Sequence, residues 1–369
     1  MEGHVEADTI PKGPLAQERE DNMPRKERIV ASAPAAIAVV GDTTDISGKG
    51  GTLSLGIEGP QPYLEGGLRA YAMVAPGGGG SASIRVQNTD EFTADTFFGA
   101  GRLLEVAGYT DRIGIEITLN TLIPPKLGLG GAAAQLVALL LALDTFFGKR
   151  RPPEELAEVV QRATLRPGQV HGYQKPYAAT FGGVRYFGFS RKLTGLWGKG
   201  VGSIYDEPYA LVSESRRAQW DALGASILLA VPRGVDMVSG EINARIAELY
   251  RTEDEATVKT MDRKTFISLL AHQRLVNGDA RGFWLLVESD TGIMEQWGLV
   301  TPEHKAIMAV AKEHGAYAAK PASTGGAVIV FCPEGREQEM MVALQGMAEQ
   351  VYPAHIAEGA RLEPNWPFA

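Results

Sequence analysis

Short apolar runs separated by polar turns dominate the first third of the chain, and they predict β-strands. The runs at residues 29–33 and 36–40 consist mainly of Ile, Val and Ala, and they end in the polar turn Gly41-Asp42-Thr43-Thr44-Asp45. The same pattern predicts further strands at residues 52–57, 68–74, 83–86 and 112–121. Residues 93–106 instead have helical spacing. We therefore expect mostly strands here, with one helix among them.

The longest apolar segment lies at residues 132–147 and predicts a buried helix. It is shorter than the roughly 20 residues that span a bilayer, so it is not expected to be a membrane anchor. A second helix is predicted from Pro152, because proline is tolerated and acidic residues are favoured in a first helical turn. A loop at residues 165–173 and a strand at 184–189 follow.

The second half of the chain alternates between strands and helices. Strands are predicted at residues 210–212, 226–231, 317–319 and 327–331, and a last strand closes the chain. Helices are predicted at residues 235–250, 263–276, 280–287, 302–314 and 336–349. Residues 190–206 carry several glycines and few long apolar runs, and residues 1–27 are polar. The predicted organisation is therefore a disordered arm at 1–27, an N-terminal lobe at 28–205 and a C-terminal lobe at 206–369.

Composition narrows the class of protein. The chain has 369 residues, of which 44% are hydrophobic, and this length exceeds the roughly 250–300 residues at which single cores stop growing. The net charge of −8 argues against a non-specific nucleic-acid binder. The single cysteine, Cys332, can form neither an internal disulfide nor a cysteine-rich metal site, so we expect a cytoplasmic protein. The chain contains 44 glycines, and their positions indicate where the backbone makes tight turns or could approach a ligand.

Three glycines stand at the start of the predicted helix 132–147, in the segment Ile123-Pro124-Pro125-Lys126-Leu127-Gly128-Leu129-Gly130-Gly131. Glycine lets a backbone approach a ligand closely, and the positive end of a helix dipole favours a phosphate. The segment is neither a P-loop nor a dinucleotide fingerprint. The local pattern thus leaves two interpretations open, a phosphate-binding loop and a turn that allows tight helix packing.

The sequence resembles the GHMP kinases, which include galactokinase, homoserine kinase, mevalonate kinase and phosphomevalonate kinase. Residues 124–134 match their motif Pro-x-x-x-Gly-Leu-Gly-Ser-Ser-Ala-Ala, except that Gly131 and Ala132 replace both serines. Residues 33–45 are similar to the first family motif and 315–326 to the third. Residues 172–183 are similar to the Gly-x-Gln-Asp-Gln-Tyr-Ala-Ala-x-Phe-Gly-Gly segment of heptose-phosphate and fucose kinases. The resemblance covers nearly all of the chain from Ile29 onward.

The resemblance implies an α/β (α+β) fold of two lobes, the first like ribosomal S5 domain 2 and the second ferredoxin-like. It implies transfer of the γ-phosphate of ATP, with Mg²⁺ bridging the phosphates, to a hydroxyl of a sugar or sugar phosphate. The implied partners are this small molecule and ATP, with no nucleic acid or membrane. A homodimer is compatible with the sequence, which does not determine the oligomeric state.

The resemblance also assigns residues. It places the nucleotide against Pro125, Lys126, Gly128, Leu129, Gly130, Gly131 and Ala132. It places the acceptor against Asp42, Asp45, Gln174, Tyr177, Ser323, Gly325 and Gly326. Lys175, which stands where many of these kinases carry an aspartate, and Asp45 are the predicted catalytic residues.

The substitutions in these motifs leave three functional hypotheses. In the first, Lys175 stabilises the transferred charge, and Asp42, Asp45 or His171 accepts a proton. In the second, the chain keeps ligand binding but has lost turnover. The third is a different transfer reaction on the same fold.

Each candidate residue also has an ordinary structural explanation. Asp42 and Asp45 could cap their turn, Tyr177 could be core, and His171 could be a solvated loop histidine. Lys320 could reach a phosphate or lie on the surface. His272, His304 and His314 have no metal-ligand spacing, so we expect no metal site built from protein ligands.

Overall fold

The computed structural model describes residues 28–47, 50–59, 67–78, 82–87, 93–110, 114–165, 170–189, 210–235, 237 and 239–368. The predicted arm at 1–27 lies outside the described residues, as does the predicted lobe boundary at 190–206. Of the described residues, none forms a helix that is both long and apolar enough to cross a membrane.

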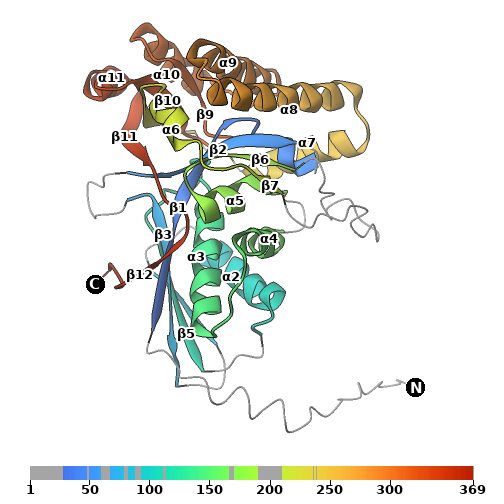
Figure 1. Ribbon diagram of the computed structural model, residues 1–369, viewed down its shortest axis with the longest axis vertical. Helices are drawn as coiled ribbons and strands as arrows, with labels where there is room; N and C mark the ends of the chain where they lie inside the picture. Colours follow the sequence, from blue (N-terminus) through green and yellow to red (C-terminus); the bar gives the residue numbers. More distant parts are fainter. Residues whose placement is uncertain are drawn as a thin grey trace.

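The N-terminal lobe is a sheet with helices packed on one face (Figure 1). Its strands are β1 (Ile29–Val40), β2 (Gly51–Glu58), β3 (Arg69–Pro76), β4 (Ser83–Val86), β5 (Ile115–Thr121) and β6 (Val184–Gly188). The helices are α2 (Thr93–Ala107), α3 (Gly131–Phe146), α4 (Pro153–Thr164) and α5 (Gln174–Phe181), and a short 3-10 turn, η1 (Thr44–Ser47), follows β1. Because α3 packs in the centre of this lobe, nearly all of its surface is apolar and buried.

Strand β1 merges the two apolar runs that the sequence separates at Pro34. Its first half pairs with β3 through residue 34, and its second half pairs with β2 from residue 35 onward. Proline has no N–H to donate, so a change of partner at this position loses no ladder hydrogen bond. The N–H of Ala36, just beyond the change, donates to the carbonyl of Leu129 in the glycine-rich turn, at 2.8 Å. β1 therefore supports the turn that begins α3.

The C-terminal lobe stacks helices against a second run of strands (Figure 1). Its strands are β8 (Ala225–Pro232), β9 (Ala318–Pro321), β10 (Val328–Pro333) and β11 (Ala348–Ile356). Its helices are α6 (Arg217–Asp221), α7 (Ser239–Arg251), α8 (Glu255–Val276), α9 (Ala280–Gln296), α10 (Pro302–Glu313) and α11 (Glu337–Leu344). Cys332 is buried in this lobe as a free thiol.

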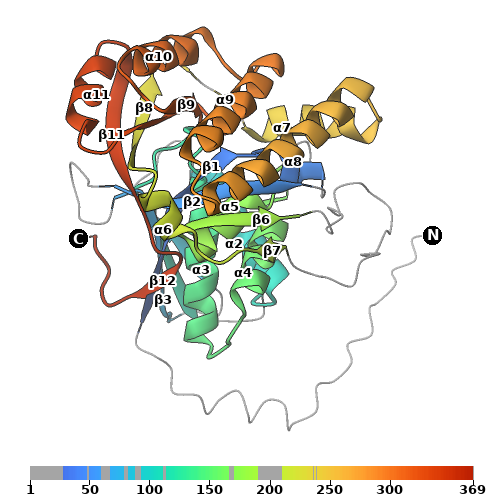
Figure 2. The same cartoon turned by 45° about the horizontal axis from the view of Figure 1, so that its top comes forward.

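Strand β11 joins the two lobes into one continuous sheet. Most of it pairs with β8, and its last residues pair with β2 through His355 and Ile356. The chain then returns to the first lobe, where β12 (Arg361–Glu363) pairs with β1, as Figure 2 shows. β7 (Leu211–Val212) also pairs with β6 of the first lobe. The boundary at 205/206 stays a prediction, and strands from beyond it complete the first sheet.

Several helices differ from the sequence-based expectation. Helix α8 begins at Glu255 and not at residue 263, the short helix α6 was not predicted, and α11 ends at Leu344 because residues 348–349 belong to β11. Helix α5 occupies residues 174–181, where we predicted no helix. Helix α9 continues to Gln296, whereas the pattern predicted an end at residue 287. The polar residues after 287 interrupt the apolar spacing, but one of them, Asp290, is fully buried because lysines of other elements neutralise it. Because the ion pairs of Asp290 form only in the tertiary structure, the sequence pattern did not predict that α9 continues beyond residue 287.

Candidate functional site

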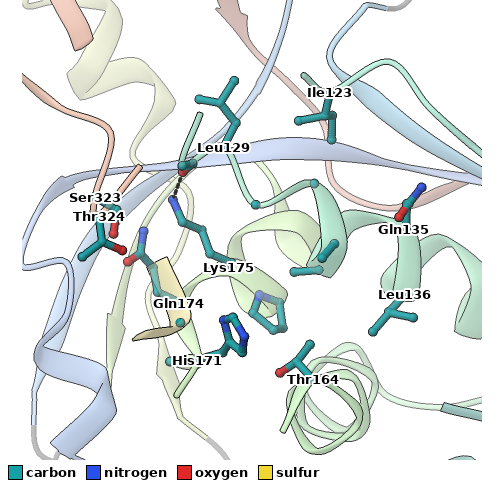
Figure 3. Close-up of a pocket in the computed structure, with 18 of the residues that line it drawn as sticks. Ile123, Leu129, Gln135, Leu136, Thr164, His171, Gln174, Lys175, Ser323 and Thr324 are labelled. Carbon is teal, nitrogen blue, oxygen red and sulfur yellow. Dashed lines mark hydrogen bonds between the residues drawn. The ribbon is translucent and has the colours of Figure 1, made fainter. Parts of the chain in front are cut away.

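A cavity of about 410 Å³ lies between the lobes, and Figure 3 shows side chains that line it. The N-terminal lobe contributes the turn after β1, the glycine-rich turn 123–130 and the first turns of α3 and α5. The C-terminal lobe contributes Met237, Gly240 and Asn243 near α7, and Ser323 and Thr324 from the turn between β9 and β10. Segments far apart in the sequence thus meet at one cavity.

The glycine-rich turn requires backbone shapes that few side chains allow. Gly128 and Gly130 have φ of 77° and 74°. A Cβ at Gly128 would also lie 1.9 Å from the carbonyl oxygen of Ala322. These two glycines let the turn pass against the third motif and present the start of α3 to the cavity.

Helix α3 begins at Gly131 with free donors directed at the cavity. Its N-cap is Gly130, which makes no side-chain capping bond, and the first N–H groups of a helix lack partners within the helix. Gly131, Ala132 and Ala133 all line the cavity. This end of the cavity therefore suits an anion.

The third motif supports the glycine-rich turn from the other lobe. The N–H of Gly326 donates to the carbonyl of Lys126 at 2.9 Å, and a Cβ at Gly325 would lie 2.1 Å from the nitrogen of Gly128. Ser323 lines the cavity, whereas Gly325 and Gly326 lie behind it. These glycines, predicted to contact the acceptor, are therefore placed where they pack against backbone.

His304 fixes this turn, a role that the sequence did not indicate. Its Nδ1 accepts from the N–H of Thr301 at 3.2 Å, so the Nε2–H donates to the carbonyl of Gly326 at 3.0 Å. Burial lowers the pKa of His304, which keeps the ring neutral. The capping residues Thr301 and His304 looked like an ordinary helix start in the sequence.

Asp45 lies in the cavity wall with 2% of its surface exposed. Its Oδ2 accepts from the N–H of Gln174 at 2.7 Å. Burial raises the pKa of Asp45 to about 6, and the hydrogen bond from Gln174 opposes part of this rise. Gly172 makes room for the carboxylate, since a Cβ there would lie 2.0 Å from Oδ2.

Two polar atoms of the cavity wall are unsatisfied among the described residues. They are Nε2 of Gln174, whose residue is 3% exposed, and Oδ1 of Asn243, whose residue is 9% exposed. A buried donor or acceptor without a partner is costly, so such atoms indicate a place for a polar ligand. Asn243 had no signal in the sequence, because a polar residue in a helix is ordinary.

Lys175 lies beneath the glycine-rich turn. Its Nζ donates to the carbonyls of Ala36 at 2.9 Å and Gly128 at 2.8 Å, and the bond to the turn is dashed in Figure 3. An ammonium has three donors, so these two bonds leave one for a ligand. Burial lowers the pKa of Lys175 to about 8, against the opposing charge of Asp42.

Asp42 is not among the cavity-lining residues, in contrast to its predicted contact with the acceptor. It lies in a fully buried cluster of four charged residues, Asp42, Lys264, Asp290 and Lys320, which we call the inter-lobe ion cluster. Burial alone would raise the pKa of Asp42, but the two ammonium groups hold it well below its usual range.

The interpretation of Lys320 as a surface residue is wrong, because its side chain is fully buried, and Lys320 is not among the cavity-lining residues. Its Nζ donates to Val39, Asp42 and Asp290 at 2.9–3.1 Å. Burial would lower the pKa of Lys320, and the two aspartates reverse this and raise it.

Tyr177 also lies outside the cavity lining, in agreement with its alternative interpretation as core. Its hydroxyl donates to Glu158 and accepts from the N–H of Ala210, and its ring packs against Phe181, Phe187 and Phe189. His171 lies in the cavity lining, and its carbonyl accepts from Gln161. The predicted nucleotide residues Pro125, Lys126, Gly128, Leu129, Gly130, Gly131 and Ala132 all line the cavity.

The residues around the glycine-rich turn do not fit a magnesium ion held by the protein. Mg²⁺ is usually held by one or two carboxylates together with phosphates. Within the described ranges, no group of three His, Cys, Asp or Glu residues could hold a metal ion, and Asp45 is the one acid in the cavity lining. Its Oδ2 is engaged by Gln174, and its raised pKa reflects a poorly solvated carboxylate. Gly131 and Ala132 provide no hydroxyl.

Comparison with known proteins relates the chain to a kinase family. Residues 96–183 match the family described as GHMP kinases N terminal domain. A mevalonate kinase of Methanothermobacter thermautotrophicus is 26% identical over 250 residues, which are 66% of this chain and 72% of that protein. The relatives found in this way are small-molecule kinases.

Solved structures show the same fold. A galactokinase of Lactococcus lactis in complex with galactose superposes with a TM-score of 0.69 at 15% identity, covering 94% of this chain and 98% of that one. A D-glycero-D-manno-heptose 1-phosphate kinase superposes with a TM-score of 0.64 at 18% identity, covering 92% and 99%. The two-lobe α/β fold expected from the motifs is thereby confirmed.

Proposed function

We propose, from the premise that this chain is related to the GHMP kinases and shares their fold, that it transfers the γ-phosphate of ATP to a hydroxyl of a sugar or sugar phosphate. One observation carries the proposal. The uncapped start of α3 and the Asp45–Gln174 pair line a single cavity between the lobes. A phosphate donor and a hydroxylated acceptor bound at these two places would lie next to each other.

The residues of the cavity suit the parts of this reaction. The N–H groups of Gly131, Ala132 and Ala133 hold phosphate oxygens, and Lys175 neutralises charge at the transferred group. The acceptor oxygen attacks the γ-phosphorus, the bond from phosphorus to the β-bridging oxygen breaks, and ADP leaves. The hydroxyl proton passes to Asp45, whose pKa near 6 suits a proton acceptor at neutral pH.

The unsatisfied atoms favour a polyhydroxylated acceptor. Gln174 offers a donor at Nε2 and Asn243 an acceptor at Oδ1. A sugar hydroxyl both donates and accepts, so neighbouring hydroxyls of one sugar would satisfy both atoms. An apolar acceptor would leave both atoms unpaired.

The second candidate is a binding protein of the same fold without turnover. It is favoured by the two carbonyl bonds of Lys175, which direct much of the ammonium toward the glycine-rich turn. The absence of a hydroxyl at Gly131 and Ala132 points the same way. A different transfer reaction on this fold is the third hypothesis.

A coupled assay of ADP release over a panel of sugars, sugar phosphates and mevalonate tests the proposal. We expect ADP release that depends on a sugar-type acceptor. Thermal unfolding with and without ATP provides the second measurement, because a ligand specific for the native state raises the melting temperature. Stabilisation by ATP without turnover on any acceptor would favour the binding protein, and absence of both would contradict both candidates.

A further inference from the structure

We infer that the cavity holds the nucleotide phosphates through lysine and backbone N–H donors, without a divalent cation bound by the protein. This inference rests on the proposed function, because it describes how the same site binds its nucleotide.

The donor set at the phosphate end of the cavity suits an anion and not a cation. The three residues that begin α3, Gly131, Ala132 and Ala133, present N–H groups and no side-chain oxygen. Among the described lining residues the acid is Asp45, which already accepts from Gln174. A hard cation needs carboxylate, carbonyl or hydroxyl oxygens, and the carbonyls of Ala36 and Gly128 are bonded to Lys175.

The charge of the cavity lining is opposite to that of the whole chain. Lys126 and Lys175 line the cavity together with Asp45, whereas the chain as a whole carries a net charge of −8. Two ammonium groups repel a divalent cation and attract a polyphosphate. Local positive charge in this acidic protein therefore favours an anionic ligand in the cavity.

Gln174 provides independent support for a ligand at the cavity. Its Nε2 is buried, has no partner among the described residues, and belongs to a side chain that lies beside Lys175 in Figure 3. An amide N–H₂ is a pure donor, so it requires an oxygen acceptor. A phosphate or hydroxyl oxygen meets this requirement, and a metal ion does not.

Calorimetric titration of the full-length protein with ATP, in EDTA and in excess Mg²⁺, tests the inference. We expect affinity in EDTA to equal or exceed affinity in Mg²⁺, because free ATP carries more negative charge than its magnesium complex. Affinity that is about tenfold or more weaker in EDTA, equivalent to about 1.4 kcal/mol, would overturn the inference and leave the proposed function intact. Absence of binding in both buffers would overturn both.

Lysine variants show whether these side chains replace the cation. Lys175→Met and Lys126→Met are each expected to weaken ATP binding in EDTA by about tenfold or more, because a charge-assisted bond to phosphate is lost. Lys259→Met is the matched control, since Lys259 is an exposed lysine of α8. Circular dichroism and thermal unfolding show whether each variant folds. If Lys175→Met does not fold, the affinity of Lys126→Met for ATP in EDTA tests the inference. Unchanged affinity in the folded variants would contradict the inference.

A gain-of-function variant provides the sharpest contrast. The double substitution Gly131→Ser and Ala132→Ser introduces the two missing hydroxyls. A Cβ at Gly131 would meet Ile123 at 3.4 Å, an ordinary contact, so a side chain fits there. We expect ATP binding by the double variant to become stronger in Mg²⁺ than in EDTA. The same Mg²⁺ enhancement in the unmodified protein would overturn the inference.

Discussion

At the scale of single residues, the buried carboxylate of Asp45 makes folding stability depend on pH. Its pKa is raised from 3.8 to about 6 in the folded protein, so the folded state binds the proton more tightly than the unfolded state. The resulting stabilisation is complete below about pH 3.8 and is lost as pH rises through about 6. At neutral pH the charged form therefore costs stability, in exchange for a proton acceptor in the cavity.

Asp45→Asn is expected to stabilise the protein at pH 7 by on the order of 2–3 kcal/mol, because the neutral amide still accepts from Gln174 without a buried charge. At pH 4 the two proteins should differ little. Kinase turnover should fall by about 10²–10⁴-fold with loss of the proton acceptor. Urea unfolding from pH 4 to 7 measures the first effect, with Asp262→Asn on the exposed face of α8 as control. If the free energies of unfolding of Asp45→Asn and of the parent protein depend on pH in the same way, this result would contradict the raised pKa of Asp45.

Gln174→Met tests the acceptor side of the cavity. Methionine has a similar size and removes a buried donor that has no partner in the described structure, so stability should stay the same or rise by about 1 kcal/mol. The KM for the acceptor should rise about tenfold, with a smaller change in kcat, if the amide binds ground state and transition state alike. Steady-state kinetics and urea unfolding provide the two readings, and Gln345→Met, at an exposed position, is the control. An unchanged KM would exclude Gln174 from the acceptor site.

At the scale of elements, the glycine-rich turn and the turn after β9 form one packed unit that presents the start of α3. Gly128 has φ of 77°, and its missing Cβ is what allows contact with Ala322. Backbone bonds from Gly326 to Lys126 and from Ala36 to Leu129 hold the unit from both sides. The position of the donors on α3 therefore depends on close approach of two backbones from different lobes.

Gly128→Ala is expected to disrupt this unit. The left-handed φ alone costs about 1–2 kcal/mol, and the collision with Ala322 adds to that cost. Gly278→Ala separates the two effects, because Gly278 has φ of 71° and a Cβ added there would meet nothing within 4 Å. Urea unfolding should show a larger loss for Gly128→Ala, and ATP should raise its melting temperature less than that of Gly278→Ala. Equal losses and equal ATP effects in both variants would contradict this role of Gly128.

At the scale of the whole molecule, the inter-lobe ion cluster connects the end of β1 to the helices of the C-terminal lobe. Lys264 comes from α8, Asp290 from α9 and Lys320 from β9. Each lysine pairs with both Asp290 and Asp42, which lies beside the turn that carries Asp45. Two positive and two negative groups balance, and Asp290 also accepts from the N–H of Gly41. The cluster thereby fixes the turn that carries Asp45 relative to the other lobe.

Asp290→Asn leaves two buried ammonium groups with one carboxylate, and we expect a loss of about 3–5 kcal/mol in the free energy of unfolding. Glu105→Gln removes one partner of the exposed pair between Arg102 and Glu105 and should cost no more than about 1 kcal/mol. Urea unfolding of both variants at neutral pH makes the comparison. A loss for Asp290→Asn as small as that of the control would show that the cluster does not stabilise the lobes.

Local patterns determined most elements of this protein. Apolar periodicity identified β4 at residues 83–86, and capping chemistry identified the start of α10 at Pro302, because both depend on neighbouring residues. The glycine motif identified the cavity-lining turn for the same reason. Helix α5, the first turns of α8 and the end of α9 were missed. In α5 the polar Lys175 is bonded to the carbonyls of Ala36 and Gly128, and in α9 Asp290 is buried against two lysines, all from distant elements.

Tertiary structure alone decided which charged residues belong to the cavity. Asp42 and Asp45 lie three residues apart in one turn and look equivalent in the sequence, yet one is neutralised by lysines of the other lobe and the other lines the cavity. Lys175 and Lys320 likewise differ only in what surrounds them. Sequence determines which groups carry charge, but the solvation and partners that set their pKa and their access to a ligand arise only when distant segments are brought together.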